Sequence, residues 1–241
     1  MPLMLSYCFG ISLLLITACD TPKEIFITEE FEKNNRSAEI KTHYFKDPLV
    51  NFLEFRAYKD SCVQCYQTDS NTNFGLIANR ITFRMYNNKK EMYFGNDSVK
   101  CVIQYSSFSK YQITEAPAID LFSKRKIYEP KPEPRNEKID SRAEGTIQIP
   151  DINNVLPFIY HNYSGYLLIS KDSFKLSPIM QGKWKPMQTL IGVQLLKGDT
   201  AYGAIHSFTG LSRKKVFLYT KATEEEQLII AAYFAVIFCQ L

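Results

Sequence analysis

The strongest structural signal in the chain is the stretch TEEEQLIIAAYFAVIFCQL, residues 223–241. Thr223 and Glu226 form a T-x-x-E capping box, a pattern with which helices begin. The run that follows has no glycine or proline, and its apolar side chains cover the whole circumference of a helix. Twelve apolar residues, 228–239, span only about 18 Å as a helix, against about 30 Å for a bilayer core. The stretch therefore predicts a helix buried inside a protein fold.

The chain before this helix is typical of β-strands. Apolar or alternating runs of five to eight residues recur from about residue 38, and turn residues such as Asn87-Asn88 and 95–97 separate them. A helix that is apolar on every side requires a sheet wrapped around it. We therefore predict a mainly β protein, an antiparallel barrel of about twelve strands that encloses a C-terminal hydrophobic helix. The residues expected to fill this barrel are Leu228, Ile229, Ile230, Ala232, Phe234 and Ile237.

One internal segment interrupts the strand pattern. Residues 129–143, EPKPEPRNEKIDSRA, are rich in proline and charge. Proline fixes φ and removes a backbone donor, so we expect a loop here. Later in the chain, tight hairpins are expected through Lys171-Asp172 and through 197–199.

The N-terminus has the pattern of a targeting segment. Residues 1–18 contain no charged side chain, and the apolar stretch 9–16 leads into ITAC, which ends at Cys19. This pattern resembles a bacterial lipobox. In that family the peptide is cleaved before the cysteine, whose thiol carries a diacylglycerol. This chain departs from the pattern because it has no Lys or Arg before the apolar stretch, and the alternatives are an ordinary signal peptide or an uncleaved anchor.

The lipobox resemblance implies a division of the chain and a location. Residues 1–18 would be the signal peptide, Cys19 the lipid attachment site and 19–37 a polar tether. Residues 38–241 would form the single barrel domain. The protein would then be a lipid-anchored membrane protein of the bacterial cell envelope, facing the periplasm or the cell exterior.

The remaining cysteines leave three interpretations open. An exported protein can hold disulfides, and the CVQC motif of Cys62 and Cys65 could serve thiol-redox chemistry, although no tryptophan precedes it. A zinc site needs four ligands. The candidates for it are Cys62, Cys65 and Cys101, with the histidines His43, His161 and His206. The third interpretation is a structural disulfide or buried thiols.

Three stretches carry a resemblance to the tubby-like superfamily, which includes phospholipid scramblases and LURP-one-related proteins. Residues 79–97 resemble an opening hairpin that turns through a polar pair, and 189–219 resemble late strands that lead to a basic turn. Residues 228–241 are similar to the enclosed helix of that family. The resemblance implies a closed barrel around a C-terminal helix.

The resemblance also implies a binding role. Tubby proteins bind phosphoinositide headgroups through basic residues on the barrel, and such residues can meet anionic headgroups at a membrane surface. The candidates in this chain are Arg213, Lys214, Lys215, Lys183, Lys185 and Trp184. The alternative is a solvated turn beside one packed indole.

Composition and motifs narrow the remaining functions. A formal net charge of +4 over 241 residues is too mild for a typical nucleic-acid binder. The chain contains no G-x-S-x-G, H-E-x-x-H, P-loop or G-x-G-x-x-G motif, so catalysis is not favoured and no cofactor is implied. We expect a membrane-anchored, non-catalytic binding module for lipid headgroups or an envelope partner. The alternative is a thiol-redox or zinc-binding exported protein that uses Cys62 and Cys65.

Overall fold

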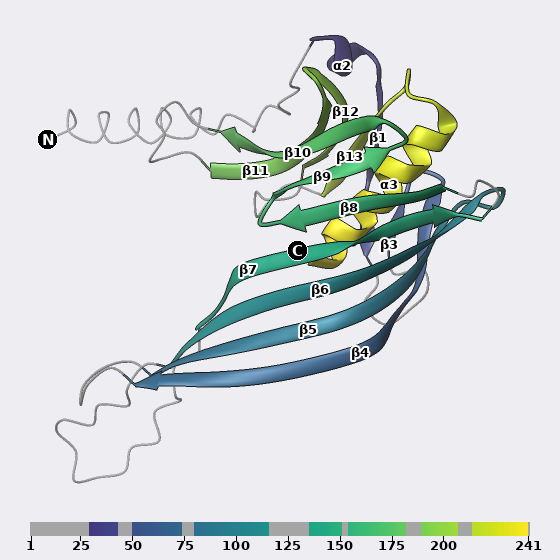
Figure 1. Ribbon diagram of the computed structural model, residues 1–241. Coiled ribbons are helices and arrows are strands. Elements are labelled where there is room, and N and C mark those ends of the chain that lie inside the picture. Colours follow the sequence, from purple (N-terminus) through teal and green to yellow (C-terminus); the bar gives the residue numbers. More distant parts are fainter. Residues whose placement is uncertain are drawn as a thin grey trace, which may run out of the picture.

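The computed structural model describes residues 29–42, 50–73, 80–115, 135–150, 154–181, 189–206 and 214–240. Two helices and thirteen strands lie in these ranges (Figure 1). The elements are α2 (Glu29–Lys33), β1 (Asn35–Glu39), β2 (Lys41–Thr42), β3 (Val50–Phe52), β4 (Phe55–Asn73), β5 (Arg80–Gly95), β6 (Lys100–Glu115), β7 (Arg135–Ile149), β8 (Asn154–His161), β9 (Ser164–Ile169), β10 (Asp172–Gln181), β11 (Thr189–Lys197), β12 (Thr200–His206), β13 (Lys215–Tyr219) and α3 (Glu224–Gln240).

The strands form one antiparallel sheet that nearly closes on itself. Its order is β1-β13-β12-β11-β10-β9-β8-β7-β6-β5-β4-β3-β2. Only Ile40 separates β1 from β2, so the segment 35–42 pairs with β13 through its first part and with β3 through its second. Counted as one strand, this segment completes a barrel of twelve. The predicted antiparallel barrel is therefore confirmed.

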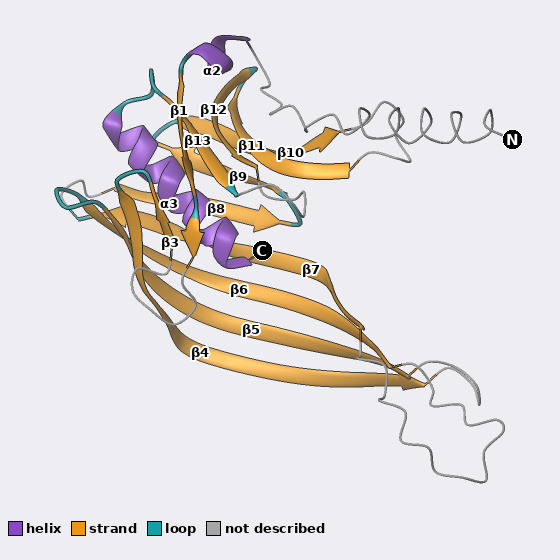
Figure 2. Cartoon of the chain, turned by 180° about the vertical axis from the view of Figure 1, so that it is seen from behind, coloured by secondary structure: helices purple, strands orange, loops and turns teal. Residues whose placement is uncertain are grey.

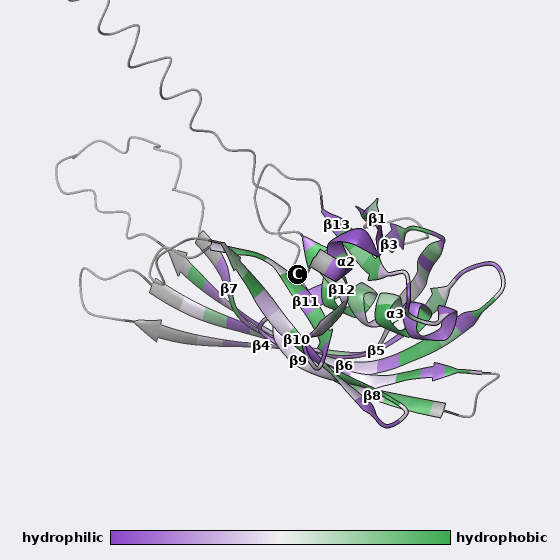
Figure 3. Ribbon diagram, turned by 90° about the horizontal axis from the view of Figure 1, so that it is seen from above, coloured by the Kyte–Doolittle hydropathy of each residue, from purple (hydrophilic) through white to green (hydrophobic). Residues whose placement is uncertain are grey.

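Helix α3 runs through the interior of this barrel (Figure 2). The six residues predicted to fill the barrel are all buried, in agreement with the largely hydrophobic α3 in Figure 3. They are Leu228, Ile229, Ile230, Ala232, Phe234 and Ile237. The capping box also forms: the Glu226 backbone N–H donates to Thr223 Oγ1 at 3.1 Å, and the Thr223 N–H donates to Glu226 Oε2 at 2.9 Å. Among the helices within the described ranges, none is long and apolar enough to cross a lipid bilayer.

Specific contacts fix the helix against the sheet. The Tyr233 hydroxyl donates to the carbonyl of Ile159 in β8 at 2.7 Å. At the last turn, Lys138 Nζ and Ser141 Oγ, both from β7, donate to the carbonyl of Gln240. A lysine placed there also complements the negative end of the helix dipole. The helix is thus held to β7 and β8 by polar contacts as well as by apolar packing.

Strands β4 to β7 are longer than the helix requires, and they run well past its C-terminal end (Figure 1). Strand β7 pairs with β8 only from Arg142 onward, and β3 pairs with β4 only as far as Ala57. We call the four-stranded part that lies past the pairing limits of β3 and β8, residues 65–73, 80–88, 107–115 and 135–141, the extension. It enlarges the outer face of the sheet beyond what a core-filled barrel needs.

Two predicted boundaries are wrong. A loop was expected at 129–143, but residues 135–143 belong to β7 and pair with β6. Residues 129–134 lie outside the described ranges. The tether expected at 19–37 is part of the barrel from residue 29. Phe31 of α2 is buried and stacks on Tyr219, and β1 pairs with β13, so these residues gain packing that an isolated polar segment would not have.

The turn expected at Asn87-Asn88 is also wrong. Strand β5 continues through both residues, which pair with β4 on one side and β6 on the other. Ladder hydrogen bonds from two neighbours outweigh the turn preference of asparagine. The turn at 95–97 lies at the end of β5 as predicted. The 197–199 hairpin is confirmed at Gly198, whose φ is +58°, and the other hairpin turns one residue earlier than expected, at Ser170 and Lys171.

Candidate functional site

A groove of about 620 Å³ lies on the outer face of the barrel, across the five neighbouring strands β4 to β8. Ile103, Tyr105 and Ser107 of β6 are buried toward the helix. Because side chains alternate along a strand, Ser106 and Phe108 point outward. We call this hollow the outer groove. Its volume falls in the range of about 300–1,000 Å³ that is usual for small-ligand sites.

Strand register arranges the outward side chains of the groove in two rows. The first row, the aromatic row, consists of Tyr66, Asn87, Phe108, Arg142 and His161. The second, the polar row, consists of Gln64, Lys89, Ser106, Glu144 and Ile159. Each row takes one residue from each of five strands, so each spans about 19 Å across the sheet.

Most polar side chains of these rows have no partner among the residues that the structure describes. Within the described part of the chain, no side-chain hydrogen bond or ion pair involves Gln64, Asn87, Lys89, Ser106 or Glu144. Tyr66 is 61% exposed, the largest exposure among the large hydrophobic and aromatic residues described. The groove therefore presents donors, acceptors and one open aromatic ring to whatever enters it.

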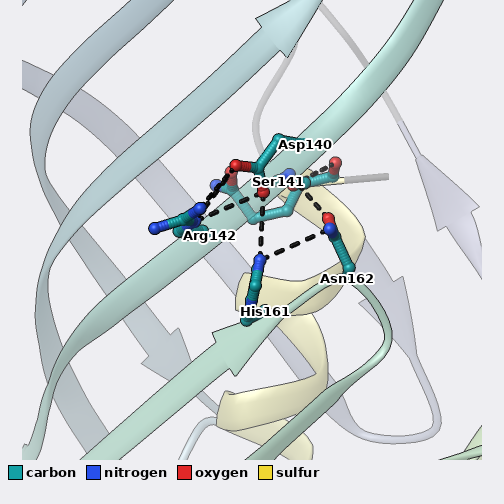
Figure 4. Close-up of polar contacts among 6 residues, drawn as sticks. Asp140, Ser141, Arg142, His161 and Asn162 are labelled. Atoms are coloured by element: carbon teal, nitrogen blue, oxygen red, sulfur yellow. Dashed lines mark hydrogen bonds and ion pairs between the residues drawn. The ribbon is translucent and has the colours of Figure 1, made fainter.

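One corner of the groove holds an ion-pair network (Figure 4). Arg142 donates from Nη2 and Nε to the carboxylate of Asp140, at 2.8 and 3.1 Å, and His161 Nε2 lies 3.2 Å from the same carboxylate. Burial raises the pKa of Asp140, but the hydrogen bond and charge of Arg142, together with His161, outweigh it and hold that pKa below its ordinary value. Asp140 is therefore ionised at neutral pH and already neutralises Arg142.

The β8–β9 turn holds this corner in place. Asn162 and Tyr163 both have positive φ, 43° and 72°, as expected for a two-residue hairpin turn between strands. The Asn162 backbone N–H donates to the carbonyl of Ser141, and the Ser141 N–H donates to Asn162 Oδ1. These two reciprocal hydrogen bonds join the turn to β7 at the point where β8 ends, and they fix His161 beside Asp140.

The corner is not arranged for nucleophilic catalysis. Ser141 is adjacent to Asp140 in sequence, but its hydroxyl points into the barrel and donates to Gln240 at 3.3 Å. A Ser–His–Asp triad needs the hydroxyl within reach of the histidine. Ser141 therefore does not serve as a nucleophile for the Asp140–His161 pair.

A second hollow, of about 650 Å³, lies where α3 begins. Its lining includes Arg36, Glu54, Glu224 and Leu228. Arg36 and Glu54 are committed to each other through two hydrogen bonds, of 2.7 and 3.0 Å. Glu224 stands in the first helical turn, where the helix dipole favours an acidic residue. These charges have structural partners, so the outer groove is the better candidate site.

Of the predicted headgroup-binding residues, the structure describes Lys214 and Lys215, and neither lines the outer groove. Arg213, Lys183, Trp184 and Lys185 lie outside the described residues, as does Cys19. Lys214 and Lys215 are half-buried at the start of β13, and Lys214 Nζ lies 6.0 Å from the centre of the Phe238 ring. Lys214 therefore packs beside the C-terminal half of α3, and both lysines lie at β13, away from the strands β4 to β8 that form the groove.

Cys65 and Cys101, two of the three candidate cysteines, do not converge, and the side chain of Cys62 lies outside the described part of the chain. Cys65 is exposed and disulfide-bonded, whereas Cys101 is a free thiol in the core. Cys65 pairs with Asn88 and Cys101 with Phe94, positions six residues apart on β5 and so about 20 Å apart along the strand. Burial raises the pKa of the Cys101 thiol to about 12. Zinc binding by all three cysteines is therefore excluded.

Other metal combinations are not supported among the described residues, where no group of three His, Cys, Asp or Glu side chains could hold an ion. His43 lies outside those residues. His161 lies in the groove and His206 pairs with Lys215 in β13, so these two histidines do not share a site.

Comparison of the chain with protein-family models, curated proteins and solved structures yields no match. The fold and the outer groove are therefore the observations on which a function has to be built.

Proposed function

We propose that the protein is a non-catalytic binding module of the bacterial cell envelope, anchored to a membrane by lipid on Cys19, and that its ligand binds in the outer groove. The interior of the barrel is filled by α3, so within the described part of the chain the large concave surfaces are on its exterior. The observation that carries the proposal is the set of partnerless polar side chains in the outer groove. Their arrangement is suited to binding, and the inward-facing Ser141 hydroxyl gives the Asp140–His161 pair no nucleophile from the neighbouring serine.

We further propose that the chain is a tubby-like barrel. The antiparallel sheet around a C-terminal helix agrees with that architecture. The likeness expected over 79–97 is weaker, because β5 continues where a hairpin was predicted. The proposal therefore rests on the topology and on the enclosed helix.

Of the two ligand classes expected from the sequence, the groove favours an envelope partner over a lipid headgroup. Among the described residues, the headgroup candidates reduce to Lys214 and Lys215, which are half-buried. The outer groove instead holds charges of both signs. Binding of an envelope component in the groove is therefore the form of the proposal that the geometry supports.

The anchor is tested by replacing Cys19. The Cys19→Ala variant has no thiol to carry lipid, so we expect it to move from the membrane fraction to the soluble fraction of the native host. Immunoblotting of both fractions measures the shift, and Cys239→Ala is the control because Cys239 lies in the packed helix. Retention of the Cys19→Ala variant in the membrane would show that the lipobox is not the anchor.

The binding surface is tested by comparing two exposed tyrosines. Tyr66 lies in the groove, whereas Tyr166 of β9, 39% exposed on the same outer face, does not line it. If the groove is occupied in the envelope, hydroxyl-radical footprinting should label Tyr66 severalfold less in intact envelopes than in the purified protein. Tyr166 should be labelled equally in both. Equal labelling of Tyr66 in the two samples would contradict the proposed binding surface.

Thiol–disulfide exchange remains a second candidate because Cys65 holds an exposed disulfide. A structural disulfide in an exported protein has a reduction potential below about −300 mV, whereas catalytic disulfides are more oxidising. Equilibration of the purified protein with a glutathione buffer series would therefore separate the two roles.

A further inference from the structure

The chemistry of the outer groove identifies a class of ligand. We propose that it binds a neutral glycan that lies extended across strands β4 to β8. This inference rests on the proposed function, because it names the ligand of the same groove. Four features support it: the balance of charge, the mixture of hydrogen-bond donors and acceptors, the exposed aromatic ring and the spacing of the strands.

Charges in and beside the groove cancel. Lys89 and Arg142 are positive, Glu144 is negative, and Asp140 neutralises Arg142 through its paired hydrogen bonds. An anionic ligand would meet the carboxylate of Glu144 as it approached Lys89, since the two lie in one row with only Ser106 between them. Desolvating unpaired like charges is costly, so the groove does not suit a phosphate or a carboxylate.

The polar row suits hydroxyl groups instead. Lys89 can only donate hydrogen bonds, ionised Glu144 can only accept them, and Gln64 and Ser106 can do both. A sugar hydroxyl is a donor and an acceptor at once, so one polyhydroxylated ligand can satisfy all four side chains. An ion of either sign would leave one of the charged groups without a partner.

The aromatic row supplies the apolar part of a sugar site. The face of an aromatic ring carries negative charge, and it attracts the polarised C–H groups on the face of a sugar ring. The Tyr66 ring is open to solvent, whereas the Arg142 guanidinium lies over the Phe108 ring, 5.7 Å from its centre, so Tyr66 is the ring that offers a free face. Neighbouring strands are about 4.8 Å apart, close to the width of one sugar ring. Successive sugars of an extended chain can therefore lie over successive strands.

The test begins with an array of neutral and acidic oligosaccharides, to which the purified full-length protein is applied in detergent. We expect retention on neutral members. Titration calorimetry with the best-retained neutral oligosaccharide should then give about tenfold weaker binding for Tyr66→Ala, equivalent to about 1.4 kcal/mol. The matched control Tyr166→Ala, on the same face but outside the groove, should bind as the unaltered protein does. Thermal melting confirms that both variants fold.

Two charge-removing variants distinguish a glycan from an anionic ligand. Lys89→Gln and Glu144→Gln should each weaken glycan binding, roughly threefold to tenfold, because each removes a charged hydrogen-bond partner. An anion such as a phosphatidylglycerol headgroup in vesicles would bind Lys89→Gln more weakly but Glu144→Gln more tightly. That opposite response, or the absence of retention on every neutral glycan, would overturn the inference. Protection of Tyr66 in intact envelopes would in that case leave the binding function standing with a different ligand.

Discussion

Replacement of Ala232 by lysine should abolish folding. Ala232 lies in the middle of α3, fully buried among the inner faces of the strands. A lysine there would bring an ammonium group among buried apolar side chains, and the buried residues described around it include no acid. The cost of a buried unpaired charge, about 5 kcal/mol or more, is comparable with the whole stability of a domain. We expect the variant to be insoluble or to lack a cooperative thermal transition.

The control for this experiment is Glu225→Lys. It introduces the same side chain into the same helix, but at an exposed position in the first turn. There it should cost no more than about 1 kcal/mol, through its unfavourable interaction with the helix dipole. A soluble Ala232→Lys protein with a native circular dichroism spectrum and an unchanged melting temperature would be incompatible with an enclosed α3.

Gly145→Val should have the second-largest effect. Gly145 lies in β7 between β6 and β8, and it pairs with Tyr105 on one side and Phe158 on the other. A Cβ at this position would overlap the carbonyl oxygen of Gln104 and lie 2.6 Å from the Cα of Tyr105. Both are backbone atoms, so the strands themselves would have to move apart. We expect a loss of about 3 kcal/mol or more in the free energy of unfolding, measured by urea denaturation.

Gly198→Ala provides the comparison for this second variant. Gly198 has a φ of +58° in the β11–β12 turn, and nothing lies within 4 Å of an added Cβ. The variant loses only the ease with which glycine adopts a positive φ, which lowers the free energy of unfolding by about 1 kcal/mol. Equal losses for the two variants would show that β7 and β6 can separate at Gly145 without disturbing the barrel.

The enclosed helix could be predicted because its signals are local and strong. Thr223 and Glu226 are three residues apart and form the cap themselves, as their hydrogen bonds confirm. The apolar residues from Leu228 onward leave no polar face, so the helix has to be buried on every side, in a protein core or in a membrane. A barrel then followed from the strand-rich remainder of the chain.

The ends of the strands could not be predicted, because they depend on distant partners. Residues 135–143 have the composition of a loop, and only their pairing with β6 makes them a strand. Asn87 and Asn88 have the composition of a turn, and neighbours on both sides keep them extended. Phe31 stands in the segment predicted to be a polar tether, and its burial against Tyr219 depends on a residue almost two hundred positions later.

The outer groove had no sequence signal for a related reason. Its lining residues, such as Gln64, Lys89 and Ser106, are ordinary surface residues in sequence, and five separate strands supply them. Strand register alone brings them into two rows. His161 was considered as a metal ligand, but its partner Asp140 stood in the segment expected to be a loop, so their pairing could not be foreseen.

The position of α3 in the chain has a consequence for biosynthesis. It follows all thirteen strands, so the ribosome produces the entire wall of the barrel before the segment that fills it. Strands without their filling expose residues such as Phe94 and Ile103, and the closing contact joins β1 to β13 across most of the chain. Pairing between strands so far apart in the sequence is slow, and it gains no stabilisation from packing against α3 until that helix has emerged. The envelope location proposed above requires export, and this order would delay folding until the N-terminus has had time to reach the export machinery.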